Sequence, residues 1–238
     1  MNFQGLTGIL VLLGIAYLLS NNRKEIKIRT VLWGLGLQFS LALMILKIPF
    51  VKSQFSILDR IFRKVISFSE TGSNFLFESF IPDVGYHVAM MNFAFRALPV
   101  IIFFSSLIAM SYHFGIVQTI IKFISKIMRS TMRTSGPETL SISANIFVGQ
   151  TEAPIIVRPF IKDMSNSELM AIMTGGFATT AGSVLALYVL WLEKIPGIAG
   201  HMLAASIMSA PAALAIAKII YPETKKSRPK NPWPLEKV

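Results

Sequence analysis

Five stretches of this sequence lack Asp, Glu, Lys and Arg over lengths close to or above that of a membrane-spanning helix. A spanning helix needs about 20 apolar residues to cross roughly 30 Å of hydrocarbon. Only 15% of the 238 residues are charged, against roughly 25% in an average soluble domain. The pattern excludes an ordinary soluble globule and predicts an all-α integral membrane protein with about five transmembrane helices. The stretches are Met1 to Asn22, Thr30 to Leu46, Ala97 to Ile121, Leu169 to Leu192 and Ile195 to Ala217.

The net charge of +11 is distributed among loops, with three basic clusters between the apolar stretches. The positive-inside rule places these clusters on the cytoplasmic side of the cell membrane and the amino terminus outside. We therefore expect a multi-pass protein in contact with membrane lipids. Nucleic acid is not expected as a partner, because the basic residues are spread over several loops and do not line one face of the protein. The clusters are Arg23, Lys24, Lys27 and Arg29; Lys122, Lys126, Arg129 and Arg133; and Lys225, Lys226, Arg228 and Lys230.

Two segments predict amphipathic helices that lie in the membrane interface. Residues 50–68 carry Phe55, Leu58 and Phe62 at helical spacing, and residues 116–133 carry a stripe of isoleucines opposite lysines and arginines. A structural role is the expected one for both. Residues 71–86 contain Gly72, which favours irregular structure or a short helix.

Residues 138–162 are apolar but too short to cross the membrane. Glu138 and Glu152 leave 13 residues between them, which is about 20 Å of helix. Gly149 and Pro154 can turn the chain, so the segment predicts a re-entrant helical hairpin with its tip at residues 148–154.

The predicted tip contains Gln150, Thr151 and Glu152 in a row. A carboxylate at this depth is costly unless it meets a ligand, an ion or a cation, so the tip is a candidate functional site. The alternative is that Glu152 pairs with a structural partner such as Arg158 or Arg96.

Residues 168–192 contain glycines and small hydroxyl residues in the middle of an apolar segment. Such residues are common on helix-packing faces in membranes. They also suit an interrupted helix, and a hairpin followed by an interrupted helix is typical of secondary transporters.

At these residues the sequence resembles the concentrative nucleoside transporter family. The segments NIFVGQTEAP (145–154) and IIVRPF (155–160) are similar to the first hairpin of the family, and TGGFATTAGSV (174–184) is similar to its broken helix. LPVIIFFS (98–105) and YHFG (112–115) are similar to the span before the hairpin.

The resemblance implies a cation-coupled nucleoside symporter with no cofactor other than its coupling ion. Gln150, Thr151, Glu152 and Val184 would contact the nucleobase. A sodium site would use oxygens of Asn145, Val148, Thr179 and Thr180, and oxygen ligands suit a hard cation. Several relatives carry serine in place of Thr179, so sodium and proton coupling both stay open. Members of the family are trimers with an elevator-like transport domain.

The family also implies a domain division, here half of an inverted-repeat transporter. Residues 1–112 would be a scaffold-like region with three spans and the interfacial helix 50–68. Residues 113–221 would be the first transport repeat, with interfacial helix 116–133, hairpin 138–162, broken helix 168–192 and helix 195–220. Residues 222–238 are expected to be a disordered cytoplasmic tail, because they combine four prolines with Lys and Arg. The second inverted repeat of the family has no counterpart after Tyr221.

Two other functions follow from the same residues. The chain could be a truncated, transport-dead remnant or an accessory subunit of a split transporter. The expected partners of the symporter itself are a homotrimer or a complementary carboxyl-terminal chain. An enzyme that uses Glu152 as acid or base is not expected. His87, His113 and His201 are isolated, and no nucleophile elbow or HExxH motif occurs.

Overall fold

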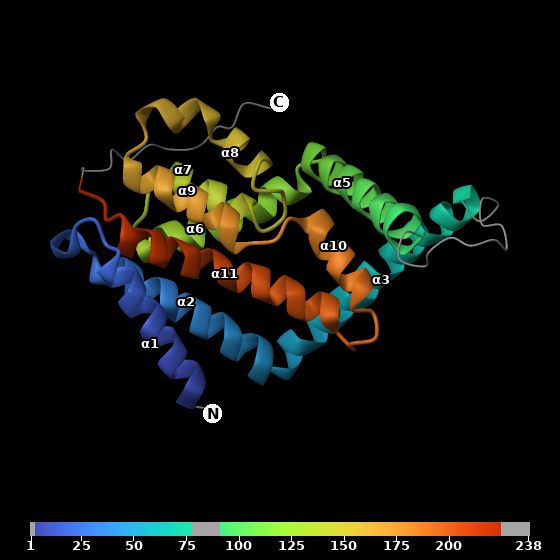
Figure 1. The fold of residues 1–238 in the computed structure, drawn as a ribbon, viewed down its shortest axis with the longest axis horizontal. Helices are drawn as coiled ribbons and strands as arrows, with labels where there is room; N and C mark the ends of the chain where they lie inside the picture. The colour runs from blue at the N-terminus through green and yellow to red at the C-terminus, as the bar shows by residue number, and fades with distance from the viewer. Residues whose placement is uncertain (1–2, 78–90, 225–238) are drawn as a thin grey trace.

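A computed structural model describes residues 3–77 and 91–224, and the regular structure in these two ranges is helical (Figure 1). The expected all-α architecture is confirmed. The elements are α1 (Phe3–Leu18), η1 (Arg23–Glu25), α2 (Ile28–Lys47), α3 (Pro49–Phe77), the π-helical turn η3 (Met91–Ala97), α5 (Leu98–His113), α6 (Ile116–Met132), α7 (Gly136–Ala144), α8 (Glu152–Ile156), η4 (Arg158–Asp163), α9 (Asn166–Ala178), α10 (Gly182–Trp191) and α11 (Ile198–Ile220).

Four helical stretches of the described residues are long and apolar enough to cross a membrane. They are Ile28–Lys47, Phe93–His113, Asn166–Trp191 and Ile198–Ile220. They correspond to four of the five expected spans. The first expected span is occupied by α1, which has 16 residues and a length of about 24 Å, shorter than the other four. The protein is a multi-pass membrane protein.

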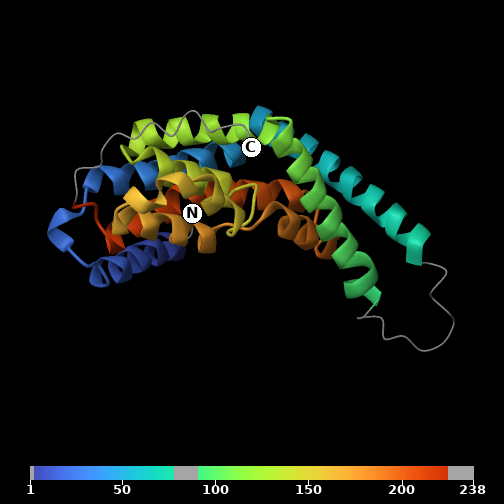
Figure 2. The same ribbon diagram turned by 90° about the horizontal axis from the view of Figure 1, so that it is seen from above.

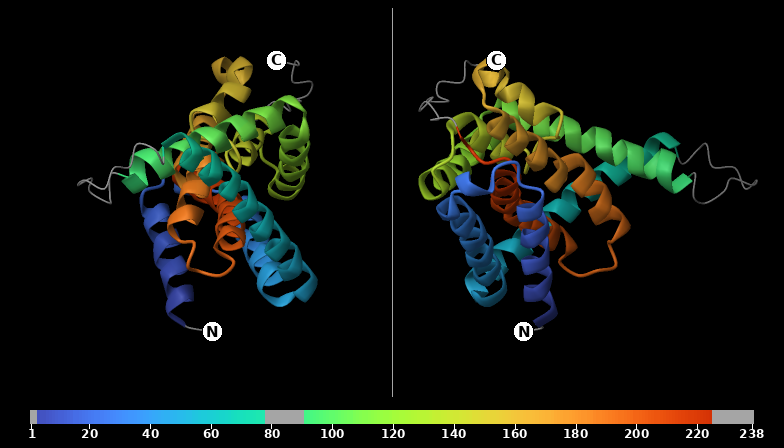
Figure 3. Two further views of the ribbon diagram at one scale, coloured as in Figure 1. Left: turned by 90° about the vertical axis from the view of Figure 1, so that its right-hand side faces the viewer. Right: turned by 60° about the vertical axis from the view of Figure 1, so that its left-hand side comes forward.

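One hydrophobic core is formed by α2, α6, α7, α9 and α11. Its buried side chains include Met128 and Met132 of α6, Ile142 and Ile146 around the end of α7, and Leu214 of α11. In both views of Figure 3, α11 lies between α1 and α2. The central position of α11 explains why over half of its apolar window is buried, against 11% for α2.

The second core is formed by α3, η3, α5, α10 and the first turn of α11. Phe62 of α3 and Phe104 of α5 stack with ring centroids 5.2 Å apart, and α3 and α5 extend together away from the rest of the molecule (Figure 2). The two cores do not follow chain order, because α2 and α3 are consecutive but pack in different ones. The division into scaffold and transport regions remains a prediction.

The helix expected at residues 50–68 is longer in the structure, where α3 continues to Phe77. Of the two expectations for the segment that starts at residue 71, irregular structure or a short helix, residues 71–77 are helical as the continuation of α3, and residues 78–90 lie outside the described ranges. Hydrogen bonds explain the extension: Thr71 donates to the Ser67 carbonyl, and Ser73 donates to the Phe95 carbonyl of η3. Contacts with η3 outweigh the low helix propensity of Gly72.

Charged residues of α3 bind the loop between α10 and α11 and hold it against α3. Asp59 accepts the Ala199 N–H at 2.9 Å and pairs with Arg63, whose guanidinium donates to the carbonyls of Glu193 and Ile195. Arg96 pairs with Glu70 at 2.5 Å and lies 3.5 Å from Glu193. Arg63 and Arg96 are therefore parts of interhelical networks.

A buried ion pair fixes the base of the predicted hairpin. The Lys218 ammonium of α11 lies 2.7 Å from the Glu138 carboxylate of α7 and 2.9 Å from Ser167 of α9. Glu223 accepts a hydrogen bond from Ser165 at 2.6 Å, and Pro222 is buried. The expected disordered tail thus begins too early at Pro222, because these two residues pack against α9 and α11. Residues 225–238 lie outside the described ranges.

Candidate binding site at the hairpin tip

Two short helices joined by an irregular tip occupy the segment predicted as a hairpin. The first arm is α7, and the return consists of α8 followed by η4. At the start of α7, the Ser135 N–H donates to the Glu138 carboxylate at 2.6 Å, so this backbone donor at the amino-terminal end of the helix has a partner. Residues 145–151 form the irregular tip, which differs from the expected 148–154 because residues 152–154 are already part of α8.

The interrupted helix predicted after the hairpin is present. Helix α9 ends at Ala178, Thr179 is extended with φ −120° and ψ 155°, and α10 starts at Gly182. Gly182 approaches two neighbours so closely that a Cβ atom would lie 2.6 Å from Ile108 Cδ1 and 2.7 Å from the Phe147 carbonyl oxygen. The Gly182 N–H donates to that same carbonyl at 3.1 Å. The absent side chain lets the break, the tip and α5 meet.

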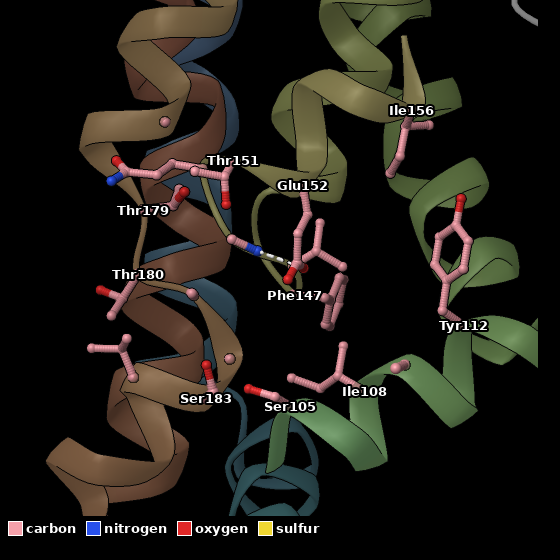
Figure 4. A pocket seen from close by; sticks show the side chains of 18 residues that line it. Ser105, Ile108, Tyr112, Phe147, Thr151, Glu152, Ile156, Thr179, Thr180 and Ser183 are labelled. Atoms are coloured by element: carbon pink, nitrogen blue, oxygen red, sulfur yellow. Dashed lines mark hydrogen bonds between the residues drawn. The ribbon is translucent and has the colours of Figure 1, made fainter. Parts of the chain in front are cut away.

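A cavity of about 630 Å³ lies where these three elements meet (Figure 4). Its volume is within the usual range for small-molecule sites. The tip and the break line one part of it, and α5 lines the other. The lining residues are Ser105, Ile108, Ala109 and Tyr112 of α5; Phe147, Val148, Gly149, Gln150, Thr151, Glu152 and Ile156 of the hairpin; and Gly176, Thr179, Thr180, Ala181, Gly182, Ser183 and Val184 around the break.

Glu152 begins α8 and points into the space between the break and α5 (Figure 4). Its carboxylate accepts the Gly149 N–H at 3.2 Å, and its side chain is exposed toward the cavity. No arginine or lysine in the described ranges forms an ion pair with it, and Arg96 pairs with glutamates elsewhere. The structural alternative, a pair between Glu152 and Arg96 or Arg158, is not formed.

Asn145 connects the hairpin to the broken helix. Its amide nitrogen donates to the Gly175 carbonyl at 2.7 Å and to the Thr179 hydroxyl, which itself lies 3.2 Å from the Asn145 carbonyl oxygen. Only 2% of Asn145 is exposed, yet its side-chain oxygen has no hydrogen-bond partner. A buried oxygen without a hydrogen-bond partner lowers the stability of the fold by about 1 to 3 kcal/mol, and a cation bound to this oxygen would remove that cost. Oxygen donors of this kind fit a hard cation.

The structure brings the residues predicted for the site together. Gln150, Thr151, Glu152 and Val184 all line the cavity, as do Val148, Thr179 and Thr180. Asn145 lies outside the lining but bonds Thr179 directly. The binding roles of these eight residues remain predictions, since the geometry shows proximity and not occupancy.

The wall formed by α5 is the part of the site that the sequence analysis missed. Ser105, Ile108 and Tyr112 face the tip from a helix that had been interpreted only as an apolar span (Figure 4). Their spacing of three, four and seven residues is that of one helix face, which is the signal that could have identified them. Phe147 of the tip also lines the cavity and was not predicted as a site residue.

Comparisons with known proteins agree with this geometry. A family model described as the Na+ dependent nucleoside transporter N-terminus matches residues 7–80, and a model described as Nucleoside recognition matches residues 94–195. An uncharacterized transporter from Haemophilus influenzae is 43% identical over 229 residues, which cover 96% of this chain and 54% of that protein. The human sodium/nucleoside cotransporter 1 is 42% identical over 223 residues, which cover 93% of this chain and 32% of that protein.

Solved structures agree as well. CNTnw in an inward-facing substrate-bound state superimposes with a TM-score of 0.84 at 40% identity, covering 95% of this chain and 54% of that one. A CNTnw variant in an outward-facing state gives a TM-score of 0.83. The chain thus spans about half the length of the bacterial relative and of CNTnw, and about a third of the human relative. The matches of both family models, the identities and the shared fold establish that this chain belongs to the concentrative nucleoside transporter family.

Proposed function

We propose that this chain supplies the nucleobase-binding and cation-binding part of a cation-coupled nucleoside symporter, which imports nucleosides across the cell membrane. The observation that carries the proposal is the cavity between the hairpin tip and the helix break, which is lined by Gln150, Thr151, Glu152 and Val184. The relatives named as sodium/nucleoside cotransporters support both the substrate class and the ion.

The chemistry of the tip suits the edge of a nucleobase. An amide, a hydroxyl and a carboxylate in a row offer both donors and acceptors, so Gln150, Thr151 and Glu152 can pair with a ring that carries alternating N–H and carbonyl groups. Glu152 as a carboxylate can accept from two neighbouring donors, one on each oxygen, whereas an amide accepts only through its single oxygen. Val184 would contact the face of the base.

The cation is a second substrate in this proposal. It would be held by the Asn145 side-chain oxygen, the Val148 and Thr180 carbonyls and the Thr179 hydroxyl. Because Thr179 begins the break that lines the nucleobase cavity, a cation that orders the break would also raise the affinity for the nucleoside. Coupling then follows from the difference in affinity between the cation-loaded and cation-free states, without any covalent step.

The ribose side of the substrate and the assembly also belong to the proposal. The chain spans about half of CNTnw, so we infer that a second chain or segment supplies the remaining contacts, as the paired interrupted segments of inverted-repeat transporters require. A trimer of such units is the assembly that we infer from the family.

The test is uridine uptake by cells that lack nucleoside uptake. The chain is expressed alone and together with the carboxyl-terminal half of the Haemophilus influenzae relative. We expect concentrative uptake from the pair, at least tenfold above the chain alone, and its loss in Glu152→Gln. Glu25→Gln is the matched control, because Glu25 is exposed on η1 and far in sequence from the cavity. Uptake that survives Glu152→Gln in the active pair would refute the assignment of Glu152, and a pair inactive despite normal membrane levels would favour a transport-dead remnant.

A further inference from the structure

Helix α6 has three distinct faces along its 17 residues, which are separated by about 120° at 100° per residue. The first is buried against the protein: Val117, Ile121, Ser125, Met128 and Met132. The second is apolar and exposed: Ile116 is 58% exposed, Ile120 41%, Phe123 66% and Ile127 40%. The third is basic: Lys122, Lys126 and Arg129 follow one another at intervals of four and three residues, and Arg133 is the residue that caps the end of the helix.

The ends of α6 place it along one side of the membrane. Its first residue follows α5, a candidate span, after a two-residue turn at Phe114 and Gly115. At its other end, the Met132 carbonyl accepts the Thr30 hydroxyl at 3.1 Å, and Thr30 lies in the first turn of α2, another candidate span. Since α2 leaves this side of the membrane and α5, the next candidate span among the described residues, returns to it, both ends of α6 lie on the same side and the helix does not cross. The basic residues that precede α2 mark this side as cytoplasmic.

From this arrangement we propose that α6 is a docking surface for anionic phospholipids of the cytoplasmic leaflet. The exposed apolar face would enter the acyl region, and the side chains of Lys122, Lys126, Arg129 and Arg133 would contact the phosphates of the headgroups. An apolar face beside a basic face on a helix at the interface is the pattern of such binding. Each basic residue near an anionic surface contributes on the order of fivefold in affinity.

The buried face of α6 gives this surface a consequence for the site. Val117 and Ile121 pack with Leu140 and Ala144 of the hairpin arm in a third core, separate from the two described above. Met128 and Met132 pack with Ile142 and Ile146 in the core formed by α2, α6, α7, α9 and α11. Lipid that fixes α6 therefore also fixes α7, the helix that supports the tip. The inference stands on these contacts and does not depend on transport.

The test uses the full chain in nanodiscs of phosphatidylcholine with increasing fractions of phosphatidylglycerol. We expect the midpoint of thermal unfolding to rise with the anionic fraction. In Lys126→Gln/Arg129→Gln, the fraction needed for half of that rise should increase at least fivefold. The matched control is Lys24→Gln/Arg29→Gln, which removes the same charge from exposed residues on the same side of the membrane. This control should respond as the unaltered chain does.

Native mass spectrometry provides a second readout if the α6 variant is less stable in phosphatidylcholine alone. We expect fewer phosphatidylglycerol adducts on that variant than on the control. Equal responses of both variants, in the unfolding midpoint or in the number of adducts, would contradict the proposal. The stabilisation by anionic lipid would then come from the net charge of the protein and not from α6. A rise reproduced by inorganic phosphate in phosphatidylcholine nanodiscs would also overturn it, because the ligand would then be a free anion.

Discussion

At the scale of single residues, Thr179 is the point where the two halves of the site meet. Its hydroxyl bonds Asn145 of the hairpin and the Gly175 carbonyl of its own helix at 3.1 Å, and its backbone is extended where α9 stops. These contacts hold the break open next to the unpaired oxygen of Asn145. Thr179 therefore links the geometry of the proposed cation site to that of the cavity.

Removing this hydroxyl tests that link. In Thr179→Ala the loss of a buried hydrogen-bond partner costs about 1 to 3 kcal/mol, so we expect the sodium concentration for half-maximal nucleoside binding to rise about tenfold. Thr179→Ser keeps the hydroxyl and should stay within about twofold of the unaltered chain. The measurement is a sodium titration of radiolabelled uridine binding to the co-expressed pair. Equal sodium dependence in Ala and Ser would show that the hydroxyl has no such role.

At the scale of elements, α2 and α11 come into close contact at Gly34. A Cβ atom at Gly34 would lie 2.7 Å from Ala215 Cβ and 2.9 Å from the Pro211 carbonyl oxygen. Two residues along the same helix, Gly36 has no atom within 4 Å of its own Cβ position. The two glycines thus differ in packing, while both are in the interior of α2. Small residues at such crossings allow helices in membranes to approach.

This pair gives a stability prediction with an internal control. Gly34→Ala should destabilise the protein by about 1 to 2 kcal/mol, because overpacking outweighs the gain in helix propensity. Gly36→Ala should leave stability unchanged or slightly higher. Thermal unfolding of both variants in detergent is the measurement. If the two variants unfold at the same temperature, the close contact between α2 and α11 is not a feature of the folded protein.

At the scale of the whole molecule, the sequence predicted the elements whose signals are local. The hairpin was predicted from the carboxylate at each end of a short apolar segment. The helix break was predicted from the glycines and small hydroxyl residues between Gly175 and Ser183. The continuation of α3 past Gly72 could not be predicted, because it depends on a contact between Ser73 and η3. The α5 wall was missed for a similar reason: the hydroxyls of Ser105 and Tyr112 acquire a role only when the tip folds against them.

If this cavity binds a nucleoside and a cation in a linked manner, the binding of each depends on the other. The most direct measurement is radiolabelled uridine binding to the purified pair of the chain and the carboxyl-terminal half of the Haemophilus influenzae relative, in sodium chloride and in choline chloride. We expect binding that is at least tenfold tighter in sodium and lost in Glu152→Gln. By linkage, uridine should tighten sodium binding by the same factor. Uridine binding that is equal in both salts, or that persists in Glu152→Gln, would contradict this expectation.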